Sequence, residues 1–413
     1  MPIHFKFLML ARFFSRFAVE MQAVVLGWRV LELTHDPLYF GLIGLAEAVP
    51  ALGMALHAGD FVDRSRPLIV MRGVMLVSLL STLNMFFAQD AYLSPALQVA
   101  MLFSASLCTG AARSFSQPAS YALVPRLVER QNLSRASAWM TAVFQIARVS
   151  GPAFGGWFLA RTSMAGATEV VGAVLLLALI TLYCIPAAIS PIAEQPATKS
   201  RAEEFFSGAK YVARHTILLP ALTLDMVSVL FAGATAMLPI YAADILRVGP
   251  GGLGDLQAAS GFGAMLISVL LVGKGIRTHA GAWLFTAVSG FGICTIVFAL
   301  SHDFSMSMVA LGLSGAFDSI SVVIRSAAVQ LSSPDSMRGR ISAVNSIFIG
   351  SSNEIGRFES GVAAKLMGTV PSVVFGGGMC LLTAVVVAVL SPALRRLDLG
   401  KLEEEHRKAG EGA

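Results

Sequence analysis

Several charged side chains lie deep inside long apolar stretches of this chain. At 1.5 Å per residue of helix, Glu20 lies about 18 Å from the start of its stretch, close to the middle of a bilayer. A charge at a lipid-facing helix centre costs about 2.5 to 3.5 kcal/mol, so we expect these side chains to face protein or water. The group near the centre comprises Glu20, Glu47, Arg148, Asp225, Asp318 and Glu354, and the group somewhat off it comprises Arg113, Arg325, Arg357 and Glu359.

The spacing of these charges indicates what they do. Arg16 and Glu20 lie four residues apart, so on a helix they can neutralise each other, and Glu354 with Arg357 can do the same. Our hypothesis is that Glu20 or Asp318 carries a proton or recognises a cation, because both are central and lack a same-face partner one turn further inward. The alternative is that each charge serves only to lock helices together.

The composition points to a membrane protein. Of 413 residues, 55% are hydrophobic and 13% are charged, against roughly 25% charged for a soluble domain. The four cysteines lie in apolar segments without a CxxC spacing, so neither a disulfide framework nor a zinc site is expected. The glycine clusters follow no predicted strand, and no nucleophile–base set is recognisable, so we expect no cofactor, no metal and no enzyme. The basic residues are scattered, which argues against nucleic acid.

About twelve apolar spans can be counted, most of them near the 20 residues that cross a bilayer. The spans are residues 8–31, 38–58, 67–88, 96–122, 137–160, 168–188, 216–242, 256–273, 282–300, 306–330, 341–366 and 370–392. Most of the loop arginines and lysines fall on one side, including Arg64, Arg66 and Arg135, so the positive-inside rule predicts cytoplasmic N- and C-termini. The first span is too long and too charged for a cleaved signal peptide, so it should stay as a helix.

The chain also divides into two similar halves. Shifting it by 205 residues aligns Gly110 with Gly315 and Gly151 with Gly356, which indicates a parallel internal repeat. We therefore expect bundles at 1–189 and 216–394, a linker at 190–215 with an interfacial helix, and a solvated tail at 395–413. The glycine-rich segment 249–254 is expected to be an outer loop.

Two motifs carry further signals. Gly59-Asp60-Phe61-Val62-Asp63-Arg64-Ser65-Arg66 lies in the short gap between the second and third spans, where Asp63 can bond a helix N-terminus and Arg64 and Arg66 can pair with acidic or carbonyl groups. The fifth span contains Gly151, Pro152, Gly155 and Gly156, where proline kinks a helix and glycine permits close packing. A generic basic turn and ordinary helix packing are the plainer explanations.

These residues resemble the major facilitator superfamily, whose loop between helices two and three reads roughly G-x-x-x-D-R-x-x-R. The segments from Trp28, from Pro125 and from Ala147 look like the branch of enterobactin exporters and macrolide efflux proteins. The resemblance implies an all-α fold of twelve transmembrane helices in two pseudo-symmetric six-helix bundles. It also implies that the charged turn latches the halves, and that the fifth-span motif is associated with export.

In that family, helices one, four, seven and ten line a central cavity, which would receive Glu20, Arg113, Asp225, Asp318 and Arg325. We therefore expect a monomeric inner-membrane secondary transporter that exchanges protons for a bulky amphipathic compound such as a drug or siderophore. Many proton antiporters of the superfamily carry an arginine early in helix four, whereas the first arginine here is Arg113. An importer, a lipid or metabolite transporter, and a membrane sensor remain alternatives on the same fold.

Overall fold

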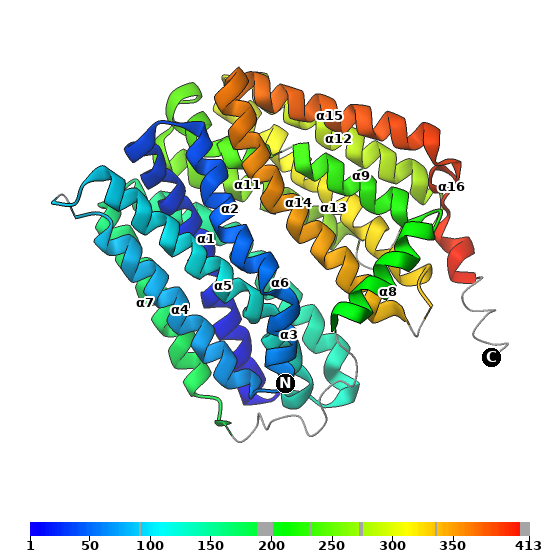
Figure 1. Ribbon diagram of the computed structural model, residues 1–413, viewed down its shortest axis with the longest axis horizontal. Helices are drawn as coiled ribbons and strands as arrows, with labels where there is room; N and C mark the ends of the chain where they lie inside the picture. Colours follow the sequence, from blue (N-terminus) through cyan, green and yellow to red (C-terminus); the bar gives the residue numbers. More distant parts are fainter. Residues whose placement is uncertain (91, 188–200, 232, 272–275, 335–336, 405–413) are drawn as a thin grey trace. The chain divides into compact units, whose positions relative to one another are not determined.

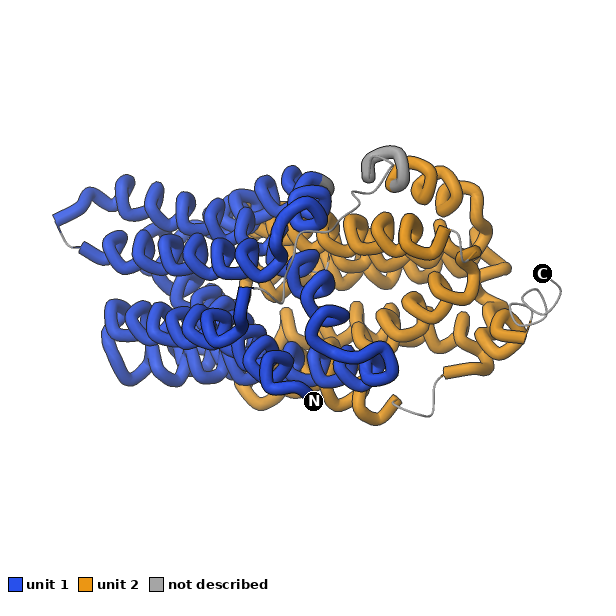
Figure 2. Tube along the Cα trace, turned by 90° about the horizontal axis from the view of Figure 1, so that it is seen from below, with its two compact units in different colours: residues 1–198, 238–258 blue, residues 199–237, 259–413 orange. Residues whose placement is uncertain are grey.

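The computed structural model describes residues 1–90, 92–187, 201–231, 233–271, 276–334 and 337–404, and these are helical with no strand among them (Figure 1). The chain divides into two compact units (Figure 2). Unit 1 consists of Met1–Thr198 with Leu238–Ala258, and unit 2 consists of Lys199–Met237 with Ala259–Ala413.

Unit 1 is built from eight helical elements before the linker and from short ones after it. The first set is α1 (Ile3–Thr34), α2 (Pro37–Gly53), α3 (Ala55–Asp63), α4 (Pro67–Phe87), α5 (Pro95–Leu127), η1 (Arg130–Asn132), α6 (Leu133–Leu159) and α7 (Met164–Tyr183). The second set is α10 (Leu238–Ile240), the π-helical turn η4 (Tyr241–Ile245) and the beginning of α11 (Gly249–Leu271).

Unit 2 contains the remaining elements. They are α8 (Arg201–Arg214), α9 (Leu218–Phe231), η3 (Ala234–Met237), the rest of α11, α12 (Ala280–Leu300), α13 (Phe304–Leu331), α14 (Arg338–Met367), α15 (Thr369–Leu390) and α16 (Pro392–Arg395). The part of the predicted linker before Arg201 and the end of the predicted tail lie outside the described residues.

Helix starts follow from local sequence. Asp36 accepts a hydrogen bond from the Leu38 amide and is followed by proline, which suits the first helical position. Ser94 does the same ahead of a proline at the start of α5, and Asp303 caps α13 through the Met306 amide at 2.7 Å. These caps satisfy amides that would otherwise be unbonded where the chain re-enters an apolar stretch.

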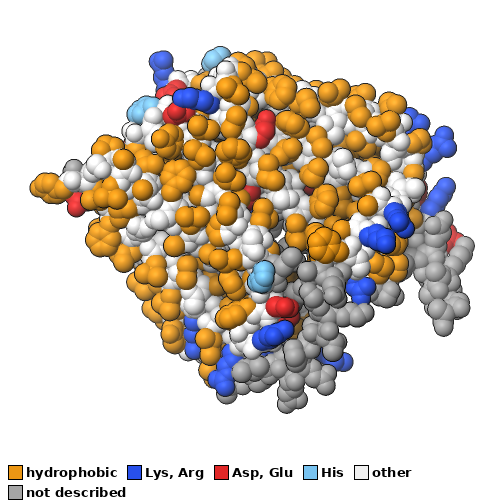
Figure 3. All heavy atoms as spheres, viewed as in Figure 1, with side chains coloured by type: hydrophobic (Ala, Val, Ile, Leu, Met, Phe, Trp, Pro, Cys, Tyr) orange, Lys and Arg blue, Asp and Glu red, His pale blue; other side chains and the backbone are white. Residues whose placement is uncertain are grey.

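The helices are long and apolar enough for membrane crossing in most cases. Eight of them qualify among the described residues, and a ninth qualifies if α2 and α3 form one bent span. The helices α1, α6 and α14 have 32, 27 and 30 residues but also carry several charges. The expected twelve crossings depend on counting these three. Hydrophobic side chains cover most of the face in Figure 3, with Lys and Arg toward its edges.

Each unit has its own apolar core. In unit 1 the core joins α1, α4, α5 and α7, and in unit 2 it joins α9, α12, α13 and α15. Representative fully buried members are Leu8, Met71, Leu123 and Leu182 in unit 1, and Leu224, Leu284, Ile324 and Cys380 in unit 2.

The second predicted span is bent, which moves the charged motif onto a helix. The pair of helices α2 and α3 turns by 50° near Gly53. Pro50 inside α2 lacks the amide that an unbroken helix needs, so a bend is expected close by. Gly59 and Asp63 therefore lie on α3, and only Arg64 to Arg66 form the turn. The expectation that the whole motif is a turn is wrong for its first five residues.

Two further expectations are wrong. The glycine-rich segment 249–254 is not a loop but the first turns of α11, where Gly254 packs directly against Gly156 of α6. The beginning of the tail is not solvated, since Leu397 and Leu399 are buried in unit 2 and the Gly281 amide donates to the Leu397 carbonyl at 3.0 Å. The seventh span corresponds to α9 followed by the short elements η3, α10 and η4.

The helix expected in the linker is present as α8, with a different surrounding. Its apolar residues Phe205, Ala209 and Val212 pack against α9 and α14 within unit 2, so this face is covered by protein. Phe206, the next residue after Phe205, is 69% exposed. The amphipathic pattern thus predicted the helix correctly, and its interfacial location stays a prediction.

Candidate functional site: charged pairs within the two units

Charged residues of unit 1 form two ion pairs at membrane depth. Arg16 and Glu20 pair along α1, as their spacing predicted. Glu47 on α2 and Arg113 on α5 pair across helices, with Nη1 2.8 Å from Oε1. The Arg113 side chain is 41% exposed, whereas the three others are 31% exposed or less. Each pair offsets the cost of holding its charges away from bulk water.

These pairs belong to one cluster. Glu20, Glu47, Arg113 and Arg148 all lie close enough to Arg16 to act on it electrostatically. The Arg16 guanidinium also lies over the Phe144 ring, 4.8 Å from its centroid. Five of the charges singled out in the sequence therefore meet in unit 1, although they come from the four separate helices α1, α2, α5 and α6.

Glycines let the helices that carry this cluster approach closely. A Cβ at Gly151 on α6 would lie 2.6 Å from the Cβ of Glu20, and a Cβ at Gly155 would lie 3.0 Å from the Cα of Met21. A Cβ at Gly110 on α5 would collide with the backbone carbonyl of Glu47. The fifth-span glycines thus hold α6 against α1 at the level of Glu20.

The rest of the fifth-span motif packs on the beginning of α11. A Cβ at Gly156 would lie 2.8 Å from the Cα of Gly254, and a Cβ at Gly254 would collide with the carbonyl of Pro152. Pro152 and Gly156 are buried, and both form this close contact with Gly254 within unit 1. Small residues here permit backbone approach, as is common between membrane helices.

Unit 2 holds the most deeply buried pair. Arg325 on α13 pairs with Asp225 on α9, and their side chains are only 2% and 9% exposed. Asp318 lies two turns earlier on α13, is half-buried, and acts electrostatically on Cys380 of α15. A pair this far from water requires both partners, because a single remaining charge would be left without compensation.

The helix α14 carries the three remaining charges. Arg357 pairs with Glu354 at 3.1 Å, as their spacing predicted, and Glu354 is 1% exposed while Arg357 is 40% exposed. Glu359 is half-buried and accepts a hydrogen bond from the neighbouring Ser360 hydroxyl at 3.5 Å.

The charged motif lies at the end of α3, beside α5. Gly59 is buried and Asp63 is half-buried, while Arg64 and Arg66 are exposed. Phe61 contacts Phe115 of α5, with ring centroids 5.7 Å apart. The structure thus locates the motif within unit 1, and its latching role stays a prediction.

A buried polar network in unit 1 was missed in the sequence. The Gln22 amide donates to Ser81 at 3.0 Å and to Thr109 at 3.3 Å, and Ser81 donates to the Ala105 carbonyl at 2.8 Å. These contacts join α1, α4 and α5. An amide inside the apolar first span, two residues after Glu20, was the signal that could have revealed them.

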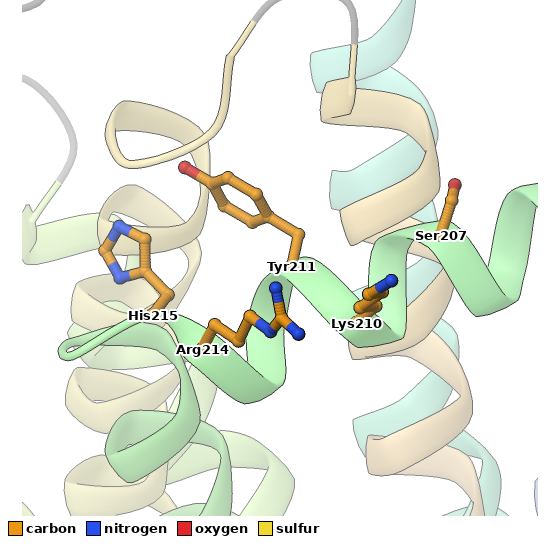
Figure 4. A pocket seen from close by; sticks show the side chains of 5 residues that line it. All are labelled: Ser207, Lys210, Tyr211, Arg214 and His215. Carbon is orange, nitrogen blue, oxygen red and sulfur yellow. The ribbon is translucent and has the colours of Figure 1, made fainter.

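A pocket on α8 was also missed. Its lining residues are Ser207, Lys210, Tyr211, Arg214 and His215, and its volume is about 310 Å³ (Figure 4). Tyr211 donates to the Ser332 carbonyl at 3.1 Å, and the His215 Nδ1 accepts from the Ile217 amide at 3.2 Å. Burial lowers the pKa of His215 below its ordinary value of 6.5. Among the described residues, no group of three or more His, Cys, Asp or Glu could hold a metal.

Comparisons with known proteins match this architecture. The profile of a family described as transmembrane secretion effector matches residues 2–409. The enterobactin exporter EntS of Escherichia coli O1:K1 / APEC is 24% identical over 402 residues, covering 95% of this chain and 92% of the exporter. The exporter of the same name from Shigella boydii serotype 18 shows the same identity and coverage.

Solved structures share the fold. A bacterial homologue of the iron transporter ferroportin, in an inward-facing state, superposes with a TM-score of 0.72 at 12% identity, covering 95% of this chain and 99% of that one. The nucleoside transporter NupG superposes with a TM-score of 0.71 at 12% identity, covering 94% and 99%.

The structural neighbours show the major facilitator fold. The family match over nearly the whole chain shows a multi-pass membrane transporter of small molecules and not an enzyme. Within that class, the chain belongs to the transmembrane secretion effector family.

Proposed function

We propose that this protein is a proton-coupled exporter of a bulky amphipathic small molecule, such as a drug or siderophore, in the inner membrane. The observation that carries the proposal is the alignment of nearly the whole chain with enterobactin exporters. The fifth-span glycines add support, because their close packing against α1 and α11 fits the association of this motif with export. The protein would act as a monomer with both termini in the cytoplasm.

The mechanism we propose is alternating access by two six-helix bundles, residues 1–189 and 216–394, rocking around a mid-membrane site. Glu20 and Asp318 are the candidate proton carriers. Protonation of Glu20 would neutralise its carboxylate and release Arg16, so proton binding would change which charges in unit 1 are paired. The proton would return to water when the carboxylate meets its arginine again. The exposed Arg64 and Arg66 would close the cytoplasmic side as part of the charged motif.

Direction and coupling can be measured together in everted membrane vesicles. With enterobactin as the first probe, respiration should drive uptake into everted vesicles, whose interior it acidifies, and none into right-side-out vesicles, whose interior it makes alkaline. Uptake that does not depend on the proton gradient, or that occurs only in right-side-out vesicles, would contradict proton-coupled export. If enterobactin is not moved, macrolides and cationic dyes are tested in the same format, and absence of driven flux for all of them rejects the proposal.

The carriers are tested by substitutions that keep shape and remove charge. Glu20→Gln and Asp318→Asn are compared with Glu32→Gln, a matched control on α1 whose partner Arg29 lies at 3.2 Å and whose side chain is 43% exposed. Loss of gradient-driven accumulation with downhill flux retained identifies the carrier. Normal coupling in both variants eliminates the assignment.

A further inference from the structure

Arg148 differs from the other arginines of the cluster around Arg16. It lies near the middle of α6, and its side chain is exposed. In the part of the chain that the structure describes, its guanidinium donates no hydrogen bond and forms no ion pair. Arg16 and Arg113, by contrast, each pair with a glutamate.

The position of Arg148 on its helix is informative. Gly151, Pro152, Gly155 and Gly156 follow it by three, four, seven and eight residues, and this spacing describes one face of a helix. One and two turns further on, the same face is closed, because its glycines pack against α1 and the beginning of α11. Arg148 thus lies on this face one turn before the closed contact, and its own side chain is exposed.

The electrostatic balance favours an anion at this position. The cluster of Arg16, Glu20, Glu47, Arg113 and Arg148 contains three positive and two negative charges, which leaves one positive charge. Both carboxylates are already paired with arginines, so the remaining charge lies on Arg148. A guanidinium at this depth is costly against lipid, so its open side must meet water or an anionic group.

We propose that Arg148 binds the anionic group of the transported molecule, so that the substrates are amphipathic anions bearing a carboxylate or a similar oxyanion. A planar guanidinium holds such a group through two parallel hydrogen bonds, which gives orientation as well as affinity. This proposal rests on the proposed transport function and narrows its substrate class. It also assigns Glu20 and Glu47 to holding the neighbouring arginines rather than to attracting a cation.

The first test uses an arginine-directed reagent, phenylglyoxal, on the purified full-length protein in proteoliposomes. Arg148 should be modified, and Arg325, which is 2% exposed and paired, should not be. Dansylphenylalanine, a bulky carboxylate, should slow modification of Arg148 about tenfold, as expected for a charge-assisted hydrogen bond. Its uncharged amide should not slow it. An unreactive Arg148, or equal effects or no effect of the two probes, overturns the proposal.

The second test uses variants and a binding ratio. Arg148→Gln should lower the preference for dansylphenylalanine over its amide about tenfold, and Arg148→Lys should restore part of it. The control is Arg161→Gln, because Arg161 lies just beyond the end of α6 over the Trp157 ring, 4.4 Å from its centroid. Its preference should equal that of the unaltered protein. Thermal unfolding should be unchanged in Arg148→Gln, because no ion pair is lost.

The two proposals fail in different ways. If gradient-driven flux is absent but Arg148 still discriminates between the two probes, the transport mechanism is wrong and the anion site stands. If flux is present but Arg148→Gln keeps the preference for the charged probe, the anion site is wrong and export stands.

Discussion

At the scale of single residues, burial separates the charged pairs into two kinds. The Asp225–Arg325 pair is almost fully withdrawn from solvent, whereas the partners of the Arg29–Glu32 pair are 20% and 43% exposed. A buried pair is strongly destabilising when only one partner is removed, while a solvent-exposed pair contributes less than about 1 kcal/mol. The two kinds should therefore respond differently to neutralisation.

We expect Asp225→Asn to lower the free energy of unfolding by about 3 to 5 kcal/mol, because Arg325 would remain buried and charged. Thermal unfolding of the purified protein in detergent measures this. The control is Glu32→Gln, which removes one partner of a more exposed pair and should cost less than about 1 kcal/mol.

The double variant Asp225→Asn with Arg325→Met provides the decisive comparison for this pair. It removes both charges and fills the space with an apolar side chain, so it should recover most of the lost stability. A double variant as unstable as the single one would mean that the pair stabilises the unit by its own attraction.

The second residue-scale prediction concerns His215, which caps the start of α9. Its Nδ1 accepts from the Ile217 and Leu218 amides at 3.2 and 3.3 Å, so the cap requires an unprotonated Nδ1. Since burial lowers the pKa of His215, the folded state disfavours the protonated form. The stability of unit 2 should be full above pH 6.5 and fall as the pH drops below it.

This dependence is measured as the unfolding temperature at neutral and mildly acidic pH. His215→Asn keeps an acceptor at the cap but cannot titrate, so it should reduce the slope between the two conditions. His406 lies outside the described residues, and it and the other histidines are present in both proteins. The difference in slope between the two proteins therefore reports on His215 alone. An equal slope in both proteins refutes the assignment.

At the scale of elements, glycine decides how closely α6 approaches α1. We expect Gly151→Ala to lower the free energy of unfolding by about 1 to 3 kcal/mol, because the added methyl would collide with Glu20 and with the Phe17 carbonyl at 2.9 Å. Gly73→Ala in α4 is the matched control, since a Cβ there meets nothing within 4 Å. That change should be neutral or slightly stabilising. Equal losses of unfolding free energy in both variants would show that helix propensity, not packing, determines the effect of the substitution.

The sequence predicts elements where hydrophobicity alone defines them. The third and ninth predicted spans, residues 67–88 and 282–300, match α4 and α12 within two residues at each end, because each is an apolar run bounded by polar residues. The pairs Arg16–Glu20 and Glu354–Arg357 were also predicted, because both partners lie on one helix.

Other features depend on contacts that a single sequence does not encode locally. Glu47 with Arg113 and Asp225 with Arg325 are separated by many residues, so their pairing requires the fold. The segment at Gly249 looked like a loop because glycine is unfavourable in isolated helices, and the packing of Gly254 on Gly156 reverses that preference. The contacts of the apolar face of α8 with α9 and α14 likewise depend on the fold.

At the scale of the whole molecule, the internal repeat has a structural counterpart. Gly151 on α6 meets α1, and its repeat partner Gly356 on α14 meets α9, where a Cβ would lie 2.9 Å from the Leu230 carbonyl. Gly110 on α5 meets the Glu47 carbonyl on α2, and Gly315 on α13 meets the Ser260 carbonyl on α11. Equivalent glycines thus make equivalent helix contacts in each half of the sequence, as a parallel repeat requires.

An even number of crossings follows if the two halves are equivalent, and this places both termini on one side. We expect fluorescent protein fusions at Met1 and at the C-terminus to fluoresce, because such reporters fold in the cytoplasm, and a periplasmic alkaline phosphatase inserted after Tyr92 to be active. Tyr92 is 98% exposed between α4 and α5, so an insertion there leaves the helices intact. The basic residues that set this orientation lie near Arg64, Arg66 and Arg135.

A matched phosphatase insertion after Ser65, in the turn between α3 and α4, should be inactive because this turn and Tyr92 lie at opposite ends of α4. Opposite readings at the two termini would mean an odd number of crossings. In that case α1, α6 or α14, whose charges set them apart from the other long helices, would not all span the membrane, and the equivalence of the halves that their glycine contacts indicate would not extend to topology.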